Sequence, residues 1–338
     1  MSTHSINIIA IDNIEPHPNA DRLEIVRILG WQCCVGKGDF KVGNKAIYVP
    51  PDYNVLLSHP SFSFLKNKDN EGKTFERIRV RKFRKVLSQG LLIPVPNELR
   101  NLPVGTNVME QMGIERWEPP IEMTSYAMFD CGPSALYAPM FDVENWQNFP
   151  EIFQDGETVI ATEKLHGSSF RAVIAVDKNG TEKFFVGTRK NWVKDDGKNW
   201  WCLCVKQHPE IESWCRQHPG TVLYGELVGY SVQFLKYGTK PNELRLYAFA
   251  ILRDGTWLDY DECVALLEGS GIPMVPLIYR GPFDKQKLLE TSDGNSTLAD
   301  HMREGIVIIP EHERHNDELP NGRVALKMVS PTYLEKGK

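Results

Sequence analysis

The segment that decides the fold is residues 158–169, TVIATEKLHGSS. Its apolar run 158–161 predicts a buried strand, and Lys164 falls at the end of that strand. Gly167 follows as a turn residue, so the lysine is held between a strand and a tight turn. A positioned, buried lysine is one of the few side chains that can attack a phosphorus atom. Alone, the pattern Lys-x-His-Gly is short enough to recur by chance, and a solvated lysine at a strand end would explain it.

Four more segments follow in a fixed order: residues 224–229 (YGELVG), 246–249 (LYAF), 304–307 (EGIV) and 324–327 (VALK). A nucleoside triphosphate is highly anionic, so attack on it needs a divalent metal and basic side chains to neutralise charge, with carboxylates to hold metal or ribose. We expect burial or a neighbouring cation to lower the pKa of the attacking lysine. The residues of the required kinds are Lys164, Arg189, Lys327, Glu226 and Glu304.

Together the five segments resemble the motifs of the covalent nucleotidyltransferase superfamily of ligases and capping enzymes. The resemblance is closest to ATP-dependent RNA ligases for two reasons, and more narrowly the chain resembles the nick-sealing type typified by the Deinococcus radiodurans enzyme. The second position after Lys164 is His166, where DNA ligases commonly carry Asp. Only eleven residues, 328–338, follow Lys327. We therefore expect no OB domain after the last motif, where DNA ligases and capping enzymes place theirs.

The resemblance implies a role for each matched residue. Lys164 would be adenylylated by ATP to a lysyl-AMP phosphoramidate, in a reaction that requires Mg²⁺ or Mn²⁺. His166 would lie near the phosphates, Glu304 near the catalytic metal, and Lys327 at the α-phosphate. The remaining nucleotide-binding residues would be Glu163 at the adenine, largely through its backbone, Ser169 near the nucleotide, Arg189 at the ribose or phosphates, Glu226 at the ribose hydroxyls and Phe249 stacked on the adenine.

Some of these positions also have plainer explanations. Arg189 fits an ordinary exposed arginine at a strand end equally well, and Phe249 fits core packing as well as stacking. Two positions depart from the pattern of many RNA ligases. Val329 stands where a second lysine follows the one matched by Lys327, and Ala250 stands where some relatives have Asp. The contacts that this lysine and this Asp make in such relatives would come from other residues in this chain.

The first third of the chain predicts a small closed barrel of short strands. Turn sequences at 36–39 (GKGD) and 41–44 (KVGN) separate apolar runs. The opening residues 14–23 (IEPHPNADRL) resemble the start of OB-type domains that bind tRNA, with His17 as a turn histidine rather than a ligand. The expected strands are 6–11, 23–29, 32–35, 46–49, 77–80 and 90–94.

A basic stretch, residues 76–85 (ERIRVRKFRK), lies in this part of the chain. On one continuous strand Arg77, Arg79 and Arg81 would share a face, opposite Ile78 and Val80. With Arg84 beyond them, this row predicts a surface that follows a nucleic-acid backbone. A solvated face of the barrel is the alternative.

From residue 152 the pattern changes to longer strands with intervening helices. We expect strands at 158–162, 170–176, 184–187, 222–225, 244–251, 305–309 and 323–329, and helices at 200–207, 209–217, 260–267 and 284–290. The fold class is therefore α+β. We expect an N-terminal OB-like β-barrel at 1–118 that binds nucleic acid, a linker or edge segment at 119–150, and an antiparallel-sheet nucleotidyltransferase domain at 151–338.

Composition limits the alternatives. The chain has 338 residues, a net charge of −5 and 41% hydrophobic residues, so it has material for two cores and is not uniformly basic. Its seven cysteines lack zinc-site spacing and predict reduced thiols in a cytoplasmic protein. The N-terminus lacks the pattern of a signal peptide, no apolar run reaches membrane-spanning length, and no obligate protein partner is evident.

The leading hypothesis is an ATP-dependent RNA ligase that joins 3′-OH and 5′-phosphate ends through lysyl-AMP. The resemblance implies a nicked duplex with RNA on the 3′-OH side as its partner. One alternative is a capping-type guanylyltransferase, which would use GTP. The other is a catalytically inactive RNA-binding protein in which the OB-like half dominates.

Overall fold

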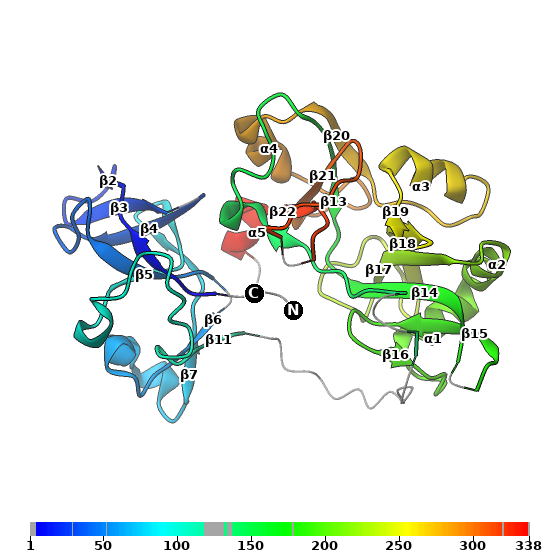
Figure 1. Cartoon of the computed structure of the whole chain (residues 1–338), viewed down its shortest axis with the longest axis horizontal. Coiled ribbons are helices and arrows are strands. Elements are labelled where there is room, and N and C mark those ends of the chain that lie inside the picture. Colours follow the sequence, from blue (N-terminus) through cyan, green and yellow to red (C-terminus); the bar gives the residue numbers. More distant parts are fainter. Residues whose placement is uncertain are drawn as a thin grey trace. The chain divides into compact units, whose positions relative to one another are not determined.

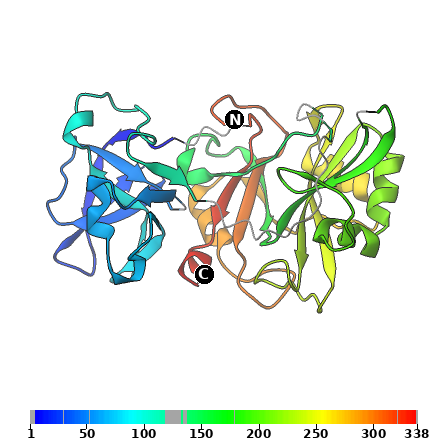
Figure 2. The same cartoon turned by 90° about the horizontal axis from the view of Figure 1, so that it is seen from below.

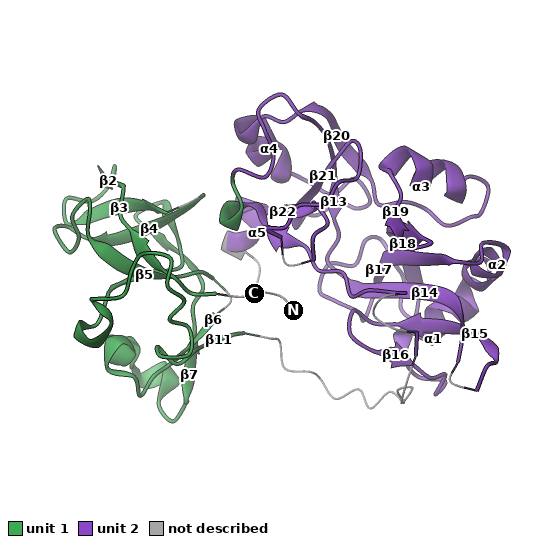
Figure 3. Cartoon of the chain, in the orientation of Figure 1, with its two compact units in different colours: residues 1–121, 147–150 green, residues 122–146, 151–338 purple. Residues whose placement is uncertain are grey.

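The computed structural model describes residues 5–28, 30–51, 53–117, 132–133, 137–177, 179–319 and 321–336. The chain divides into two compact units (Figures 1 and 3). Unit 1 comprises residues 1–121 and 147–150, and unit 2 comprises residues 122–146 and 151–338. The expected domain boundary at 118 and residues 119–131 of the expected linker lie outside the described residues. Within that segment, β12 (Glu144–Asn145) belongs to unit 2, where it pairs in parallel with β22 (Leu326–Val329), whereas residues 147–150 belong to unit 1.

Unit 1 is a set of short antiparallel strands around two apolar clusters. Alternation of buried and partly exposed residues along β4 shows why these segments are strands with one face in the core. The sheets are β1 (Ile8–Ala10), β5 (Lys45–Val49) and β10 (Leu91–Pro94); β2 (Asn13–Pro16), β3 (Leu23–Ile28) and β4 (Trp31–Gly36); β11 (Ile114–Arg116), β6 (Tyr53–Leu56) and β7 (Phe75–Arg77); and the hairpin β8 (Val80–Phe83) with β9 (Val86–Gln89). The 3-10 helices are η1 (Pro60–Leu65), η2 (Lys68–Asn70) and η3 (Asn97–Leu99) in this unit and η4 (Trp146–Asn148) after β12.

The expected single strand at 77–80 is wrong. Strand β7 ends at Arg77, which pairs with Asn54, and β8 begins at Val80, which pairs with Gln89. The chain leaves one sheet and enters a separate hairpin between these residues, so no common strand face unites Arg77, Arg79 and Arg81. The Arg77 guanidinium instead lies 3.3 Å from the ring centroid of Trp117.

Unit 2 contains two sheets that lie side by side (Figures 1 and 2). All their pairings are antiparallel except that of β12 with β22. In order, the six-stranded sheet contains β16 (Trp192–Val193), β15 (Glu182–Gly187), β14 (Ser168–Val176), β17 (Thr221–Gly229), β18 (Leu244–Arg253) and β19 (Thr256–Trp257). The five-stranded sheet contains β12, β22, β21 (Gly305–Pro310), β13 (Thr158–Lys164) and β20 (Leu277–Pro282).

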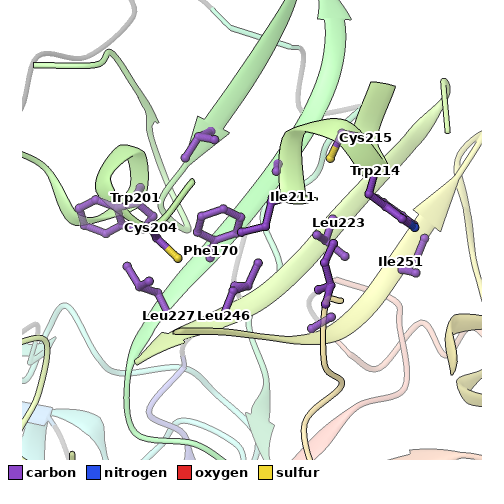
Figure 4. Close-up of a cluster of buried hydrophobic side chains, with 14 of the residues drawn as sticks. Phe170, Trp201, Cys204, Ile211, Trp214, Cys215, Leu223, Leu227, Leu246 and Ile251 are labelled. Carbon is purple, nitrogen blue, oxygen red and sulfur yellow. The ribbon is translucent and has the colours of Figure 1, made fainter. Parts of the chain in front are cut away.

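The six-stranded sheet is covered on both faces by apolar side chains. On one face, α1 (Trp200–Gln207) and α2 (Glu210–Gln217) pack through residues such as Trp201 and Trp214 (Figure 4). Helix α3 (Tyr260–Leu267) adds Cys263 to the same cluster. On the other face, a second cluster joins it to the five-stranded sheet, with Val173 and Tyr224 meeting Ile160 and Ile309. Helix α4 (Lys285–Ser292) lies between β20 and β21 in the sequence, and α5 (Pro331–Lys336) follows β22.

The expected helices at 200–207 and 260–267 are confirmed with the same bounds, and the other two are displaced by one or two residues. Strands β16, β19 and β20 and helix α5 were not expected, since these short elements carry little periodicity of their own. The six cysteines of the described residues are free. No helix in the described part of the chain is long and apolar enough to cross a membrane.

Candidate functional site

The opening segment carries the chain from one sheet of unit 2 to the other. Strand β13 of the five-stranded sheet ends at Lys164, and β14 of the six-stranded sheet begins at Ser168. The three residues between them include His166 and Gly167. The strand-to-strand crossing therefore presents the lysine and the histidine where the two sheets approach each other.

Lys164 forms a close ion pair with Glu304. The Lys164 Nζ lies 2.6 Å from Glu304 Oε1, and the two side chains are 24% and 12% exposed. Glu304 reaches this position because it precedes β21, whose first residue, Gly305, pairs directly with Lys164. The first and fourth of the five sequence segments are thus joined by sheet register.

The ion pair overturns the expected pKa of the lysine. Burial lowers the pKa of Lys164, but the carboxylates of Glu304 and Glu226 outweigh burial and leave it above its ordinary value. For Glu304, burial raises the pKa, but Lys164 and His166 together lower it more, to about 2. In the free protein Lys164 is therefore a protonated partner of Glu304, because both of its strongest electrostatic neighbours are acidic.

Glu226 is the second carboxylate beside the lysine. It lies on β17 opposite Ser169 on β14, and its Oε1 accepts a hydrogen bond of 3.0 Å from the Gly167 backbone N–H. Burial, opposed by the charge of Lys164, raises the pKa of Glu226 to about 7. A side chain at Gly167 would clash with the Leu227 carbonyl oxygen, so glycine lets the crossing pass close to β17.

His166 is fixed at both its backbone and its ring. Its backbone N–H donates to the Tyr237 hydroxyl at 2.6 Å, and its ring Nδ1 lies 3.2 Å from the Tyr333 hydroxyl. The ring centroid is 4.6 Å from that of Phe234. The histidine therefore stands in an aromatic pocket rather than in a freely solvated turn.

Glu163 points into a different set of contacts. Its Oε2 accepts from the backbone N–H and the hydroxyl of Thr297, at 2.9 and 3.0 Å. Its own backbone N–H donates to the Pro276 carbonyl oxygen at 2.8 Å. Of its backbone polar groups, the carbonyl oxygen is therefore the one that could contact an adenine.

Three buried polar atoms of this region have no hydrogen-bond partner among the described residues: Glu163 Oε1, His166 Nε2 and Glu304 Oε2. Buried polar groups in native proteins are nearly always paired, with protein, water or a ligand. Their concentration around Lys164 marks this region as a site for a polar ligand.

The other expected residues occupy elements of unit 2. Arg189, after β15, pairs with Asp142 at 2.8 Å, and its charge acts on Glu226. Phe249 on β18 packs against Phe141 at 5.8 Å between ring centroids. Lys327 on β22 pairs in register with Val307 and Asn145. Core packing of Phe249 is confirmed, and the roles assigned to these residues toward a nucleotide remain predictions.

Sequence reasoning missed Asp142, Tyr237, Thr297, Phe234 and Tyr333. Each lies in a loop or short element without a motif, and each reaches the site only through folding. No spacing in the sequence could have found them.

The carboxylates here suit a divalent metal bound jointly with phosphate. No group of three or more His, Cys, Asp or Glu within the described ranges is arranged to hold a metal ion. Mg²⁺ commonly uses one or two carboxylates and completes its shell with water and substrate phosphates. Glu304, whose Oε2 is buried and unpartnered, fits that mode, as does Glu226 beside it.

A second candidate surface lies on unit 1, at the β8–β9 hairpin. Its two-residue turn, Arg84-Lys85, has φ values of 44° and 74°, a conformation that favours Asn-Gly. His17 and Asn19 hold the turn: the His17 Nδ1 accepts from the Asn19 N–H, so its Nε2 donates to the Phe83 carbonyl at 3.0 Å. Asn19 donates to the Arg84 carbonyl at 2.9 Å. The expectation that His17 is a turn histidine is confirmed.

Comparison with known proteins identifies the class. A family model described as RNA ligase matches residues 157–329, and an OB-fold domain model matches residues 5–95. The chain belongs to the RNA ligase family, with an N-terminal OB-fold and a sheet-rich nucleotidyltransferase domain, as the sequence predicted.

The whole chain also resembles solved structures of an RNA ligase from Naegleria gruberi. The complex with PPi is 27% identical, has a TM-score of 0.82 and is matched over 98% of both chains. A mutant with ATP and Mn is 26% identical, with a TM-score of 0.84 over 98% of this chain and 99% of that one. A mutant with AMP and Mn is 27% identical, with a TM-score of 0.83 over 98% of both. A search of curated proteins returns no match.

Proposed function

We propose that this RNA ligase uses ATP and a divalent metal and works through a lysyl-AMP intermediate on Lys164. The observation that carries the proposal is the largely buried Lys164–Glu304 pair, with the unpartnered Glu304 Oε2 and His166 Nε2 at the same place. The Naegleria structures with ATP, AMP, PPi and Mn support the choice of nucleotide and metal.

In the first step, the Lys164 Nζ, after losing a proton, attacks the α-phosphorus of ATP. A nitrogen–phosphorus bond forms and the bond to the β-phosphate oxygen breaks, releasing pyrophosphate. Glu304 is the nearest acceptor for the proton, at 2.6 Å. Its carboxylate also suits a divalent metal, which would neutralise phosphate charge when bound.

In the second step, a 5′-phosphate oxygen of the substrate takes AMP from Lys164. In the third step, a 3′-OH attacks the phosphorus of the substrate's 5′-phosphate, which expels AMP and forms a new phosphodiester bond. Nucleotide contacts assigned to Glu163, Ser169, Arg189, Glu226, Phe249 and Lys327 follow from family resemblance, supported by their location around the crossing.

Incubation with α-labelled ATP and Mg²⁺ or Mn²⁺ tests the first step. We expect an acid-labile adduct on the wild-type protein and none on Lys164→Ala. Lys206→Ala is the matched control, because it also removes a lysine from a carboxylate pair, with Asp195, but on an exposed surface. Labelling by GTP rather than ATP would support a capping-type enzyme. Nucleic-acid binding without any adduct would support an inactive binding protein.

The preferred substrate is proposed to be a nicked duplex with RNA on the 3′-OH side. A panel of nicks with RNA or DNA on each side tests this choice. Sealing that requires RNA only on the 3′-OH side is the expected result, and equal sealing of an all-DNA nick would contradict it. A cytoplasmic location remains a prediction, supported by the free cysteines of the described residues.

We assign nucleic-acid binding by unit 1 to the β8–β9 hairpin, with Arg79, Arg81 and Arg84 exposed on or beside it. Their combined replacement by Ala should weaken binding and reduce the salt dependence of the binding constant by about one unit for each phosphate that the variant no longer neutralises. Removing as many charges from loop 66–73, at Lys66, Lys68 and Lys73, is the control. Equal effects of the two triple variants would overturn the assignment. Arg77, stacked on Trp117, should contribute less.

A further inference from the structure

The short helix that ends the described chain brings Tyr333 onto the ring of His166. The Tyr333 hydroxyl oxygen lies 3.2 Å from His166 Nδ1, and the ring centroids are 5.7 Å apart. Phe234 completes the contact, since its ring lies 4.6 Å from that of His166 and stacks on Tyr333 at 6.0 Å and 15°. One face and one nitrogen of His166 are therefore occupied by aromatic residues from two distant segments.

Tyr333 is the closer partner of this nitrogen. Glu304 Oε2 lies 3.4 Å from the same Nδ1, too far for a strong hydrogen bond, and its other oxygen accepts from Lys164. The opposite ring nitrogen, Nε2, is buried and has no hydrogen-bond partner among the described residues. A bond from the Tyr333 hydroxyl to Nδ1 would leave the hydrogen of a neutral ring on Nε2.

The position of Tyr333 is itself fixed by a cluster of hydrogen bonds. Asp293 accepts from the Ser330 hydroxyl at 2.6 Å and from the Thr332 hydroxyl at 2.9 Å. The Ser330 backbone N–H donates to the Glu304 carbonyl at 2.9 Å, and its hydroxyl accepts from the Tyr333 N–H at 3.1 Å. The start of α5 is thus tied to the same strand end that carries Glu304.

The two groups near His166 Nδ1, the Glu304 carboxylate and the Tyr333 hydroxyl, differ in how they depend on Lys164. Once its nitrogen is bonded to phosphorus, Lys164 no longer offers Glu304 the ammonium group it has in the free protein. The Tyr333 hydroxyl requires no charge on Lys164. It can hold the histidine ring in the same orientation before and after nucleotide transfer.

We propose that Tyr333 is a positioning residue of the ligase site, which orients His166 through Nδ1 so that Nε2–H meets the phosphate groups. The inference rests on the proposed function for the identity of the ligand. It adds a residue outside all five sequence motifs, held in place by Asp293 through Ser330 and Thr332.

Tyr333→Phe tests the proposal, because it removes the hydroxyl and keeps the ring packing. Single-turnover rates of lysyl-AMP formation, AMP transfer and sealing are measured separately. We expect the rate of the step or steps that His166→Ala impairs to fall about tenfold, the effect expected for the loss of one hydrogen bond. In a His166→Ala background, Tyr333→Phe should have no further effect, whereas a merely structural role would persist there.

The ¹⁵N resonances of the His166 ring give a readout independent of ligation. They are identified by their absence from the spectrum of His166→Ala. Tyr333→Phe should shift Nδ1 more than Nε2, and Thr332→Val, which weakens the helix anchor without touching the ring, should shift both less. Unchanged Nδ1 in Tyr333→Phe overturns the proposal, as does an undiminished loss of rate in the double variant. Failure of the wild-type protein to form lysyl-AMP would instead overturn the proposed function, and the resonances would still decide the role of Tyr333.

Discussion

Replacement of Lys164 by Met should make the stability of the protein depend on pH in a defined way. Methionine keeps an unbranched side chain but removes the charge that holds Glu304 ionised. In the wild-type protein, Lys164 together with His166 lowers the pKa of Glu304 from 4.5 to about 2, against the opposing effect of burial. A shift of this size corresponds to about 3 kcal/mol of folding free energy.

The sign follows from linkage between protonation and folding. Because the pKa of Glu304 is lower in the folded state, its contribution is complete above the unfolded value of 4.5 and is lost as pH falls toward 2. In Lys164→Met, Glu304 is left buried without its cation, a change that typically costs about 3–5 kcal/mol near neutral pH. Protonation of Glu304 at lower pH relieves that cost, so the two proteins should converge in stability as pH falls.

Urea unfolding at a series of pH values from 8 to 4 measures this difference. Lys206→Met is the control, because its pair with Asp195 lies exposed to solvent and should contribute little to stability. Adding Glu304→Gln to Lys164→Met should recover much of the missing stability at pH 8. A destabilisation by Lys164→Met that stays constant from pH 8 to 4 would refute the coupling.

Three further predictions concern the crossing and the hairpin. Burial raises the pKa of Glu226 to about 7, so the contribution of Glu226 to stability is lost as pH rises from 4.5 through 7. Glu226→Gln should therefore stabilise the protein above pH 7 by up to about 3 kcal/mol and leave it unchanged near pH 4. Measurement of Tm against pH checks this, and an equal effect at both pH values would contradict it. Gly167→Ala should cost about 1–3 kcal/mol by clashing with the Leu227 carbonyl and should slow adduct formation, and wild-type values in urea unfolding and labelling would exclude the clash. The double variant Arg84→Asn, Lys85→Gly should raise the free energy of unfolding by roughly 1 kcal/mol, seen as a higher Tm, because Asn and Gly adopt the two positive φ angles more easily. It should also weaken nucleic-acid binding, because it removes two positive charges. If both stability and binding increased, the basic turn would have no role in binding.

Much of unit 2 was predictable because its signals are local. The apolar run before Lys164 and the helical spacing at 260–267 gave elements close to those observed. The basic stretch 76–85 misled the prediction because alternation along a sequence describes one strand only if the strand is continuous. Here the chain changes sheets between Arg77 and Val80, and hydrogen bonding to two different partners decides the faces.

The charge state of the lysine was likewise beyond the sequence. The residue types near Lys164 were expected to include cations that lower its pKa, but its strongest electrostatic neighbours are the carboxylates of Glu304 and Glu226. Electrostatic interactions fall steeply with distance, so a pKa depends on separations of a few ångströms that no motif specifies. The aromatic pocket around His166 went unseen for the same reason.

The sequence by itself determined the fold class, the order of the two domains and the lysine at the centre of the candidate site, because periodicity, glycine turns and motif order are properties of neighbouring residues. Tertiary structure alone decided which groups surround that lysine. Pairing of Lys164 with Gly305 brings Glu304 to it across 140 residues, and the anchoring of α5 brings Tyr333 to His166 across 167. Such contacts arise from sheet register and side-chain packing between remote segments, which become defined only when the whole chain has folded.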